Sequence, residues 1–120
     1  TSPAEKSPVL CRDGARGVGK YVLGEHDVLA ARKFPDAAAR GCWPVEKWDA
    51  DGNFSVQYPP AGDFYEIPKR SLCSTAFDNL FVAGKSISAE PGAIASARVV
   101  GTCLATGEAA AKMGVKGVKP

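Results

Sequence analysis

The sequence predicts an α/β fold, because a short apolar strand ends at a glycine, a long helix of small residues follows, and several short strands precede both. Residues 80–83 are an apolar run that breaks at Gly84, which is typical of a buried strand. Residues 92–114 have a helical pattern, in which small side chains recur along one face: Ala93, Ala97, Gly101, Ala105 and Ala109. In α/β folds, a strand, a glycine and a helix in this order bind anionic cofactors.

The composition fits one globular domain. The chain has 120 residues, of which 45% are hydrophobic and 23% charged. Its net charge of +2 is too small to indicate a nucleic-acid partner. Nothing resembles a signal peptide, and no apolar stretch reaches the roughly 18–20 residues of a membrane span. Because the chain begins at Thr1 without a Met, we expect it to be part of a longer protein.

The cysteines are evenly spread and do not predict a metal site. Cys11, Cys42, Cys73 and Cys103 form no C-x-x-C pair, and His26 is the only histidine. Zinc sites need clustered ligands, so we expect none here. We expect reduced thiols, as in a cytoplasmic protein.

The first part of the chain is predicted to be rich in β-structure. Residues 1–14 contain two prolines and are expected to form a flexible lead-in. In the β-rich segment 15–72, residues 20–23 are predicted as a strand and residues 24–32 as one or two helical turns that end before Pro35. Residues 36–43 stay ambiguous, because three alanines favour helix while the flanking prolines favour an extended segment.

A β-hairpin is predicted in the middle of the chain. Asp51-Gly52 lies at the centre of a turn between residues 45–48 and 54–58. Phe54, Val56 and Tyr58 alternate as in a half-buried strand, and Trp43 and Trp48 are expected to cover the apolar face of the hairpin. Residues 64–68 form a further strand that ends at a proline, which indicates an edge or a terminus.

Gly14 to Lys20 fits the G-x-x-x-x-G-K part of a phosphate-binding P-loop. The position after the lysine is Tyr21, which does not replace the small hydroxyl ligand of magnesium. The residues that follow have a strand pattern where a P-loop needs a helix. We therefore interpret this segment as a glycine turn.

Three ordered motifs resemble the carboxyl-terminal part of FAD-dependent oxidoreductases of the glutathione-reductase-like type. They are YEIPKRSL at residues 65–72, NLFVAGKSIS at 79–88 and SARVVGTCLATGEAA at 96–110. The resemblance implies a two-part FAD-binding fold, in which a β-rich substrate or cap segment (15–72) precedes a strand and helix of the Rossmann sheet (73–114) and a tail (115–120). No G-x-G-x-x-G loop is present, so the resemblance implies that the pyrophosphate site lies in a missing amino-terminal part.

The resemblance also implies site residues. The cofactor-binding set is Ala83, Gly84, Lys85, Ala95, Ser96, Ala97 and Arg98. A helix beginning near Ser96 is expected to aim its N-terminus at the pyrimidine edge of the flavin, where negative charge develops on reduction. Substrate-binding candidates are Arg16, Tyr65 and Arg70. The structural alternative for Tyr65 is packing in the core. The structural alternative for Arg70 is an ion pair with Glu66 or Asp78. Arg98 has an ion pair as its alternative.

The sequence thus predicts the carboxyl-terminal part of an FAD-dependent oxidoreductase that transfers a hydride between a small organic substrate and flavin. Its catalytic residues are unknown. Alone, the chain is expected to be inactive, not to hold FAD, and to be able to associate through an exposed strand edge. The alternative is a non-enzymatic binding module, whose small-residue helix packs against a partner protein.

Overall fold

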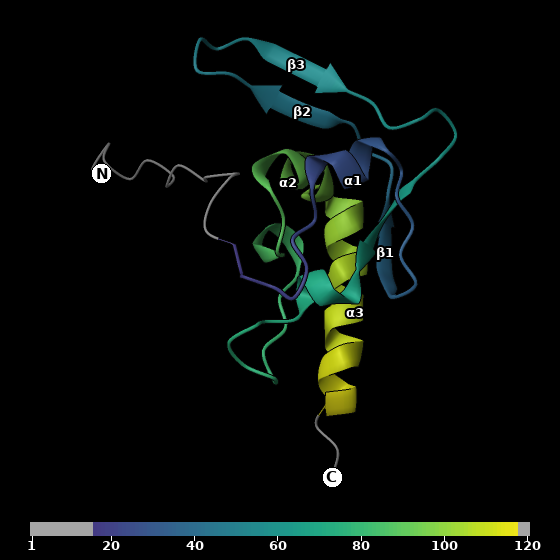
Figure 1. Cartoon of the computed structure of the whole chain (residues 1–120), viewed down its shortest axis with the longest axis vertical. Coiled ribbons are helices and arrows are strands. Elements are labelled where there is room, and N and C mark those ends of the chain that lie inside the picture. Colours follow the sequence, from purple (N-terminus) through teal and green to yellow (C-terminus); the bar gives the residue numbers. More distant parts are fainter. Residues whose placement is uncertain (1–15, 118–120) are drawn as a thin grey trace, which may run out of the picture.

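The chain forms a mixed arrangement of helices and two small antiparallel sheets in a computed structural model that describes residues 16–117 (Figure 1). The lead-in, Cys11 and the first residues of the P-loop-like segment lie outside this range. The elements are, in order, α1 (Glu25–Leu29), β1 (Ala37–Gly41), β2 (Val45–Trp48), β3 (Phe54–Gln57), β4 (Tyr65–Pro68), the 3-10 turns η1 (Lys69–Leu72) and η2 (Gly84–Ser86), α2 (Pro91–Ala97) and α3 (Val100–Gly117). The class is α+β, because the described strands form two small antiparallel sheets rather than the parallel sheet of an α/β fold.

The ambiguous segment before Trp43 is a strand. β1 pairs antiparallel with β4, which places Gly41 opposite Tyr65. A Cβ atom at position 41 would lie 2.4 Å from the Tyr65 ring, so only glycine permits this pairing. The extended form prevails over the helix propensity of the alanines because it buries the Tyr65 side chain completely.

The predicted hairpin is confirmed as β2 and β3, which pair antiparallel. Its turn is closed by the Asp49 carboxylate, which accepts hydrogen bonds from the backbone N–H groups of Asp51 (2.9 Å) and Asn53 (2.8 Å). Gly52 has φ +82°, a conformation that favours glycine.

The expectation of a half-buried third strand is wrong. Every residue of β3 is exposed, and Trp48, which packs on the Phe54 ring at 4.8 Å, is 69% exposed. The reason is that the opposite face of the hairpin, with Val45, lies toward the body.

The predicted long helix is two helices. α2 ends at Ala97 and α3 begins at Val100, with Arg98 as the C-cap of α2. The β-branched Val99 and Val100 favour helix less than the alanines around them. The Arg98 carbonyl accepts a hydrogen bond from the Cys103 thiol at 3.2 Å, which stabilises the junction.

Residues 20–23 and 80–83 do not form the predicted strands. The first make only isolated bridges, such as Leu23 with Ala89, and Phe81 makes one with Cys73. A parallel sheet needs neighbouring strands, and the described chain offers none to these segments. Residues 80–83 instead run beside η1, where the Val82 N–H donates to the Leu72 carbonyl at 2.9 Å.

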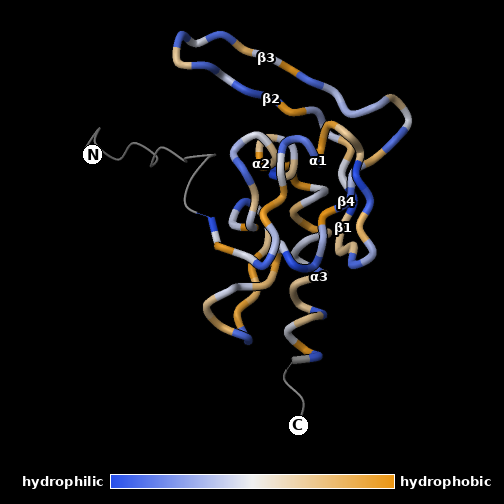
Figure 2. The backbone as a smooth tube through the Cα atoms, viewed as in Figure 1, coloured by the Kyte–Doolittle hydropathy of each residue, from blue (hydrophilic) through white to orange (hydrophobic). Residues whose placement is uncertain are grey.

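The core lies where α1, α2 and β4 meet. It includes Leu23, Val28, Ile67 and Ile94, all nearly or fully buried, and the apolar parts of the tube in Figure 2 converge there. None of the helices within residues 16–117 has the length and hydropathy to cross a membrane.

A buried hydrogen-bond chain crosses this core. The Tyr65 hydroxyl lies 2.8 Å from Ser96 Oγ, and the Ser96 hydroxyl donates to the Trp43 carbonyl at 2.5 Å. Because Ser96 uses its own proton on that carbonyl, Tyr65 is the donor to Ser96. β4, α2 and the loop after β1 are thereby joined.

Replacing Tyr65 by Phe tests this chain of hydrogen bonds. We expect Tyr65→Phe to lower the free energy of unfolding by about 1 kcal/mol, because the buried Ser96 oxygen loses its donor. The matched control is Tyr58→Phe, at a residue that is 74% exposed, which should leave stability nearly unchanged. Urea unfolding of the three proteins makes the comparison, and equal stabilities would contradict the role of the hydroxyl.

Alkaline pH should destabilise the fold through the same residue. Burial raises the pKa of Tyr65 to about 12, above its ordinary value of 10.0. The unfolded chain therefore loses this proton at lower pH than the folded one. This contribution to stability is complete below pH 10 and is lost as pH rises toward 12. We expect the stability advantage of the natural chain over Tyr65→Phe to shrink across this interval in urea titrations, and a constant difference would contradict it.

Candidate cofactor-binding site

An apolar pocket of about 500 Å³ lies where α3 begins. One wall comes from the end of β1 and the loop behind it, residues 40–43, and from Phe64. The other comes from the start of α3, through Val99, Gly101 and Thr102. The pocket therefore joins the β-rich half of the chain to its helical half.

The first turn of α3 gives this pocket a positive end. The first backbone N–H groups of a helix have no acceptor inside the helix, and the helix dipole adds to their charge. In α3 these groups include those of Gly101 and Thr102, and the first turn contains no acidic side chain. No Asp or Glu lines the pocket, whereas Arg40 does. The pocket thus combines an apolar lining with positive charge, which suits a ligand that is largely apolar and negative at one end.

Gly101 leaves room for such a group. A Cβ atom built at this position would have no heavy atom within 4 Å. Because Gly101 lines the pocket, that atom would project into open space, and its absence lets a ligand approach the backbone closely.

The aromatic walls are held by other contacts. The Trp43 indole N–H donates to the Glu46 carboxylate at 2.6 Å, and its carbonyl is the acceptor for Ser96. The Arg40 guanidinium lies over the Phe64 ring, 4.8 Å from its centroid. For Arg40 no ion pair is found among residues 16–117, so its charge is available to an anionic ligand.

The residues predicted to bind cofactor lie beside this pocket without lining it. Ala95, Ser96 and Ala97 are buried within α2, and Ala95 and Arg98 line a separate groove between α2 and β2. The expected helix start near Ser96 is therefore four residues too early, because the break at residues 98–99 places the N-terminus at Val100.

The other predicted cofactor residues, Ala83, Gly84 and Lys85, lie at η2, which contacts both α2 and α3. Gly84 has φ +65°, and its N–H donates to Thr106 Oγ1 at 3.1 Å. The structure thus gathers both predicted groups around the α2–α3 junction.

The predicted substrate residues are not brought together. Tyr65 lies in the core, and Arg16 lies at the start of the described chain, where the next residue, Gly17, bonds to Ser86. Arg70 forms an ion pair with Asp36 at 3.0 Å, and its hydrogen bond lowers the pKa of that carboxyl. The partner of Arg70 is thus neither Glu66 nor Asp78.

The sequence interpretation missed the residues that line the pocket. Arg40, Cys42, Trp43 and Phe64 belong to no motif that carries a known chemistry. Gly101-Thr102 lies inside the SARVVGTC motif, but an unbroken helix hides its position at a helix start. Only the interruption between α2 and α3 places Gly101 and Thr102 in the first turn of a helix, and the helical pattern of residues 92–114 did not predict that interruption.

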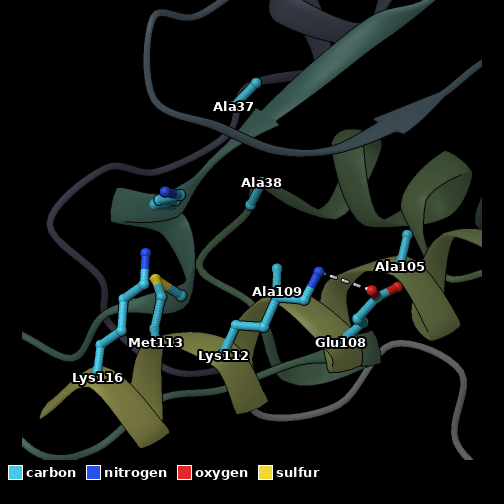
Figure 3. Close-up of a pocket in the computed structure, with 9 residues that line it drawn as sticks. Ala37, Ala38, Ala105, Glu108, Ala109, Lys112, Met113 and Lys116 are labelled. Atoms are coloured by element: carbon cyan, nitrogen blue, oxygen red, sulfur yellow. Dashed lines mark ion pairs between the residues drawn. The ribbon is translucent and has the colours of Figure 1, made fainter.

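A second cavity, of about 320 Å³, lies farther along α3 (Figure 3). Lys69, Lys112 and Lys116 line it, and Glu108 forms an ion pair with Lys112 at 2.9 Å. Its lysines are exposed, so solvent screens their charges. Within the described part of the chain, no group of His, Cys, Asp and Glu side chains is arranged to hold a metal ion.

Comparison with known proteins identifies one family. Residues 8–115 match the sequence model of a family described as FAD dependent oxidoreductase. No curated protein and no solved structure matches the chain significantly.

The space at Gly101 can be measured by substitution. Gly101→Ala should raise the free energy of unfolding by about 0.5 kcal/mol, because alanine favours helix and the added methyl meets no atom. Gly107→Ala, equally open and deeper in α3, should raise it by about 0.5–1 kcal/mol. Thermal unfolding measures both, and a destabilised Gly101→Ala would show that the pocket is closed in solution.

Proposed function

Because this chain belongs to the FAD dependent oxidoreductase family, we propose that it is the carboxyl-terminal portion of a glutathione-reductase-like flavoprotein. The whole protein would transfer a hydride between a small organic substrate and FAD. The observation that carries the proposal is the apolar pocket at the start of α3, which the N-terminus of that helix makes positive at one end.

The residues of the pocket fit the ring system of a flavin. Bound FAD would exchange a hydride with the substrate at its isoalloxazine ring and gather negative charge at the pyrimidine edge. The N–H groups of the first turn of α3 would stabilise that charge. Trp43 and Phe64 would exclude water from the ring, and Gly101 would let it lie close to the helix.

Arg40 would hold an anionic group at the same site. It lies on the rim beside Phe64 and has no ion pair among the described residues. The planar guanidinium of Arg40 has several N–H donors, which suit a carboxylate of the substrate or a phosphate of FAD. We propose this role for Arg40 in place of the one predicted for Arg70, because the Arg70 guanidinium bonds to Asp36.

An amino-terminal part that carries a pyrophosphate loop is the first partner that we propose. Without a G-x-G-x-x-G loop, this chain lacks the contacts that anchor the FAD pyrophosphate, so alone it would neither hold FAD nor be active. The apolar side chains of Val100 and Leu104 on α3 are 75% and 70% exposed, as expected of a surface that another domain covers. In this arrangement residues 15–72 would be the cap segment, and residues 73–114 would complete a Rossmann-like domain.

The same exposed side of α3 suits the alternative, a binding module without catalysis. In that case a partner protein would cover Val100 and Leu104, and the pocket would hold no flavin. The free thiols of Cys42, Cys73 and Cys103 are consistent with a reducing, cytoplasmic location in either case.

A longer protein that contains this chain and a pyrophosphate loop provides the test. Purified, it should show flavin absorbance between about 300 and 550 nm, whereas the 120-residue chain should be colourless. Gly101→Val should remove most of the bound flavin, because the new side chain enters the pocket. Gly107→Val, on the same helix and outside the pocket, is the control that should keep it. A longer protein that takes up no added FAD would overturn the proposal and favour the binding module.

A further inference from the structure

The β2–β3 hairpin presents its apolar face to solvent. In the register of the hairpin, Trp48 lies opposite Phe54, and Val56 shares their face because it is two residues from Phe54. These side chains are 69%, 47% and 36% exposed. The face turned toward the body carries Lys47, whose ammonium group lies 2.5 Å from the Glu25 carboxylate. The hairpin is thus held with these three apolar side chains outward, on a face that also carries Glu46 opposite Val56.

The outer edge of the hairpin is also free. β2 contacts α2, whereas β3 is the outermost strand in Figure 1 and pairs only with β2 among the described residues. An unpaired strand edge is a template for another strand, and proteins usually protect it with charged residues or prolines. Residues 53–58, Asn-Phe-Ser-Val-Gln-Tyr, contain neither. Nothing in the sequence of this edge opposes pairing.

We propose that two copies of this chain associate through β3, forming a four-stranded antiparallel sheet about a two-fold axis at Val56. In this register Val56 lies opposite Val56 of the second copy. Phe54 lies opposite Tyr58 of the second copy on the same face, which makes an aromatic cross-strand pair. On the other face Ser55 lies opposite Gln57, and both can form hydrogen bonds.

The charges of the hairpin favour this occupant over a charged partner. The paired edge is neutral, so two copies bring no like charges opposite each other. The charged side chains directly across from the middle of β3 are Glu46, opposite Val56, and Lys47, opposite Ser55; they bond to Trp43 and to Glu25. The free edge of β3 is therefore a small, uncharged surface that is complementary to a second copy of itself. An interface of this size is at the weak end of specific association, so we expect a dissociation constant of about 10–100 μM.

Sedimentation equilibrium of the 120-residue chain tests the proposal, over concentrations from about tenfold below to about tenfold above that constant. The mass should rise from that of one 12.5 kDa chain to that of two. Val56→Lys should keep the chain monomeric, because it places two ammonium groups opposite each other at the axis. The matched control, Val56→Thr, keeps a β-branched side chain without charge and should still dimerise. Circular dichroism confirms that both variants are folded.

Two outcomes would overturn the proposal. One is a natural chain that stays monomeric over the whole range, as expected if another domain covers the hairpin. The other is a folded Val56→Lys variant that still dimerises, which would assign the contact to another surface, such as the exposed side of α3. Neither outcome bears on flavin binding, which depends on the pocket at Gly101.

Discussion

The buried hydroxyl of Tyr65 holds the two halves of this molecule together. The ring of Tyr65 packs on Gly41, its hydroxyl bonds to Ser96 in α2, and Ser96 bonds to the carbonyl of Trp43. Trp43 in turn forms a wall of the pocket at the start of α3. The geometry of the candidate cofactor site therefore depends on a contact in the core. That contact requires a glycine in β1, a tyrosine in β4 and a small hydroxyl in α2.

The break between α2 and α3 gives the pocket its electrostatic character. In a continuous helix from Pro91 onward, the backbone N–H of Gly101 would form a hydrogen bond within the helix and could not bind a ligand. Because α2 ends at Ala97 and α3 begins at Val100, a second set of unpaired N–H groups becomes available. The Cys103 thiol satisfies the carbonyl that the break leaves free. The interruption between α2 and α3 therefore gives this region a helix N-terminus whose free N–H groups suit an anionic ligand.

Local chemistry made part of this structure predictable. The Asp49–Asn53 turn, the strand that ends at Pro68 and the short α1 each follow from residues within a few positions of one another. Residues 80–83 resemble a strand because their composition suits one, yet a strand exists only beside a neighbour, and the described residues supply none. The orientation of the hairpin is also non-local, since the Lys47–Glu25 ion pair and the buried Val45 decide which face turns outward. The pocket was missed for the same reason, because Arg40, Trp43, Phe64 and Gly101 meet only after folding.

The contact between Gly41 and the Tyr65 ring has an evolutionary consequence. A side chain at position 41 has no space while an aromatic ring occupies position 65, and Ser96 has a buried partner only while that ring carries a hydroxyl. Relatives that share this core should therefore change the three positions together or not at all. A larger residue in β1 should accompany a smaller one in β4, and the loss of the tyrosine should accompany the loss of the serine. We therefore expect selection to treat these three residues as one unit.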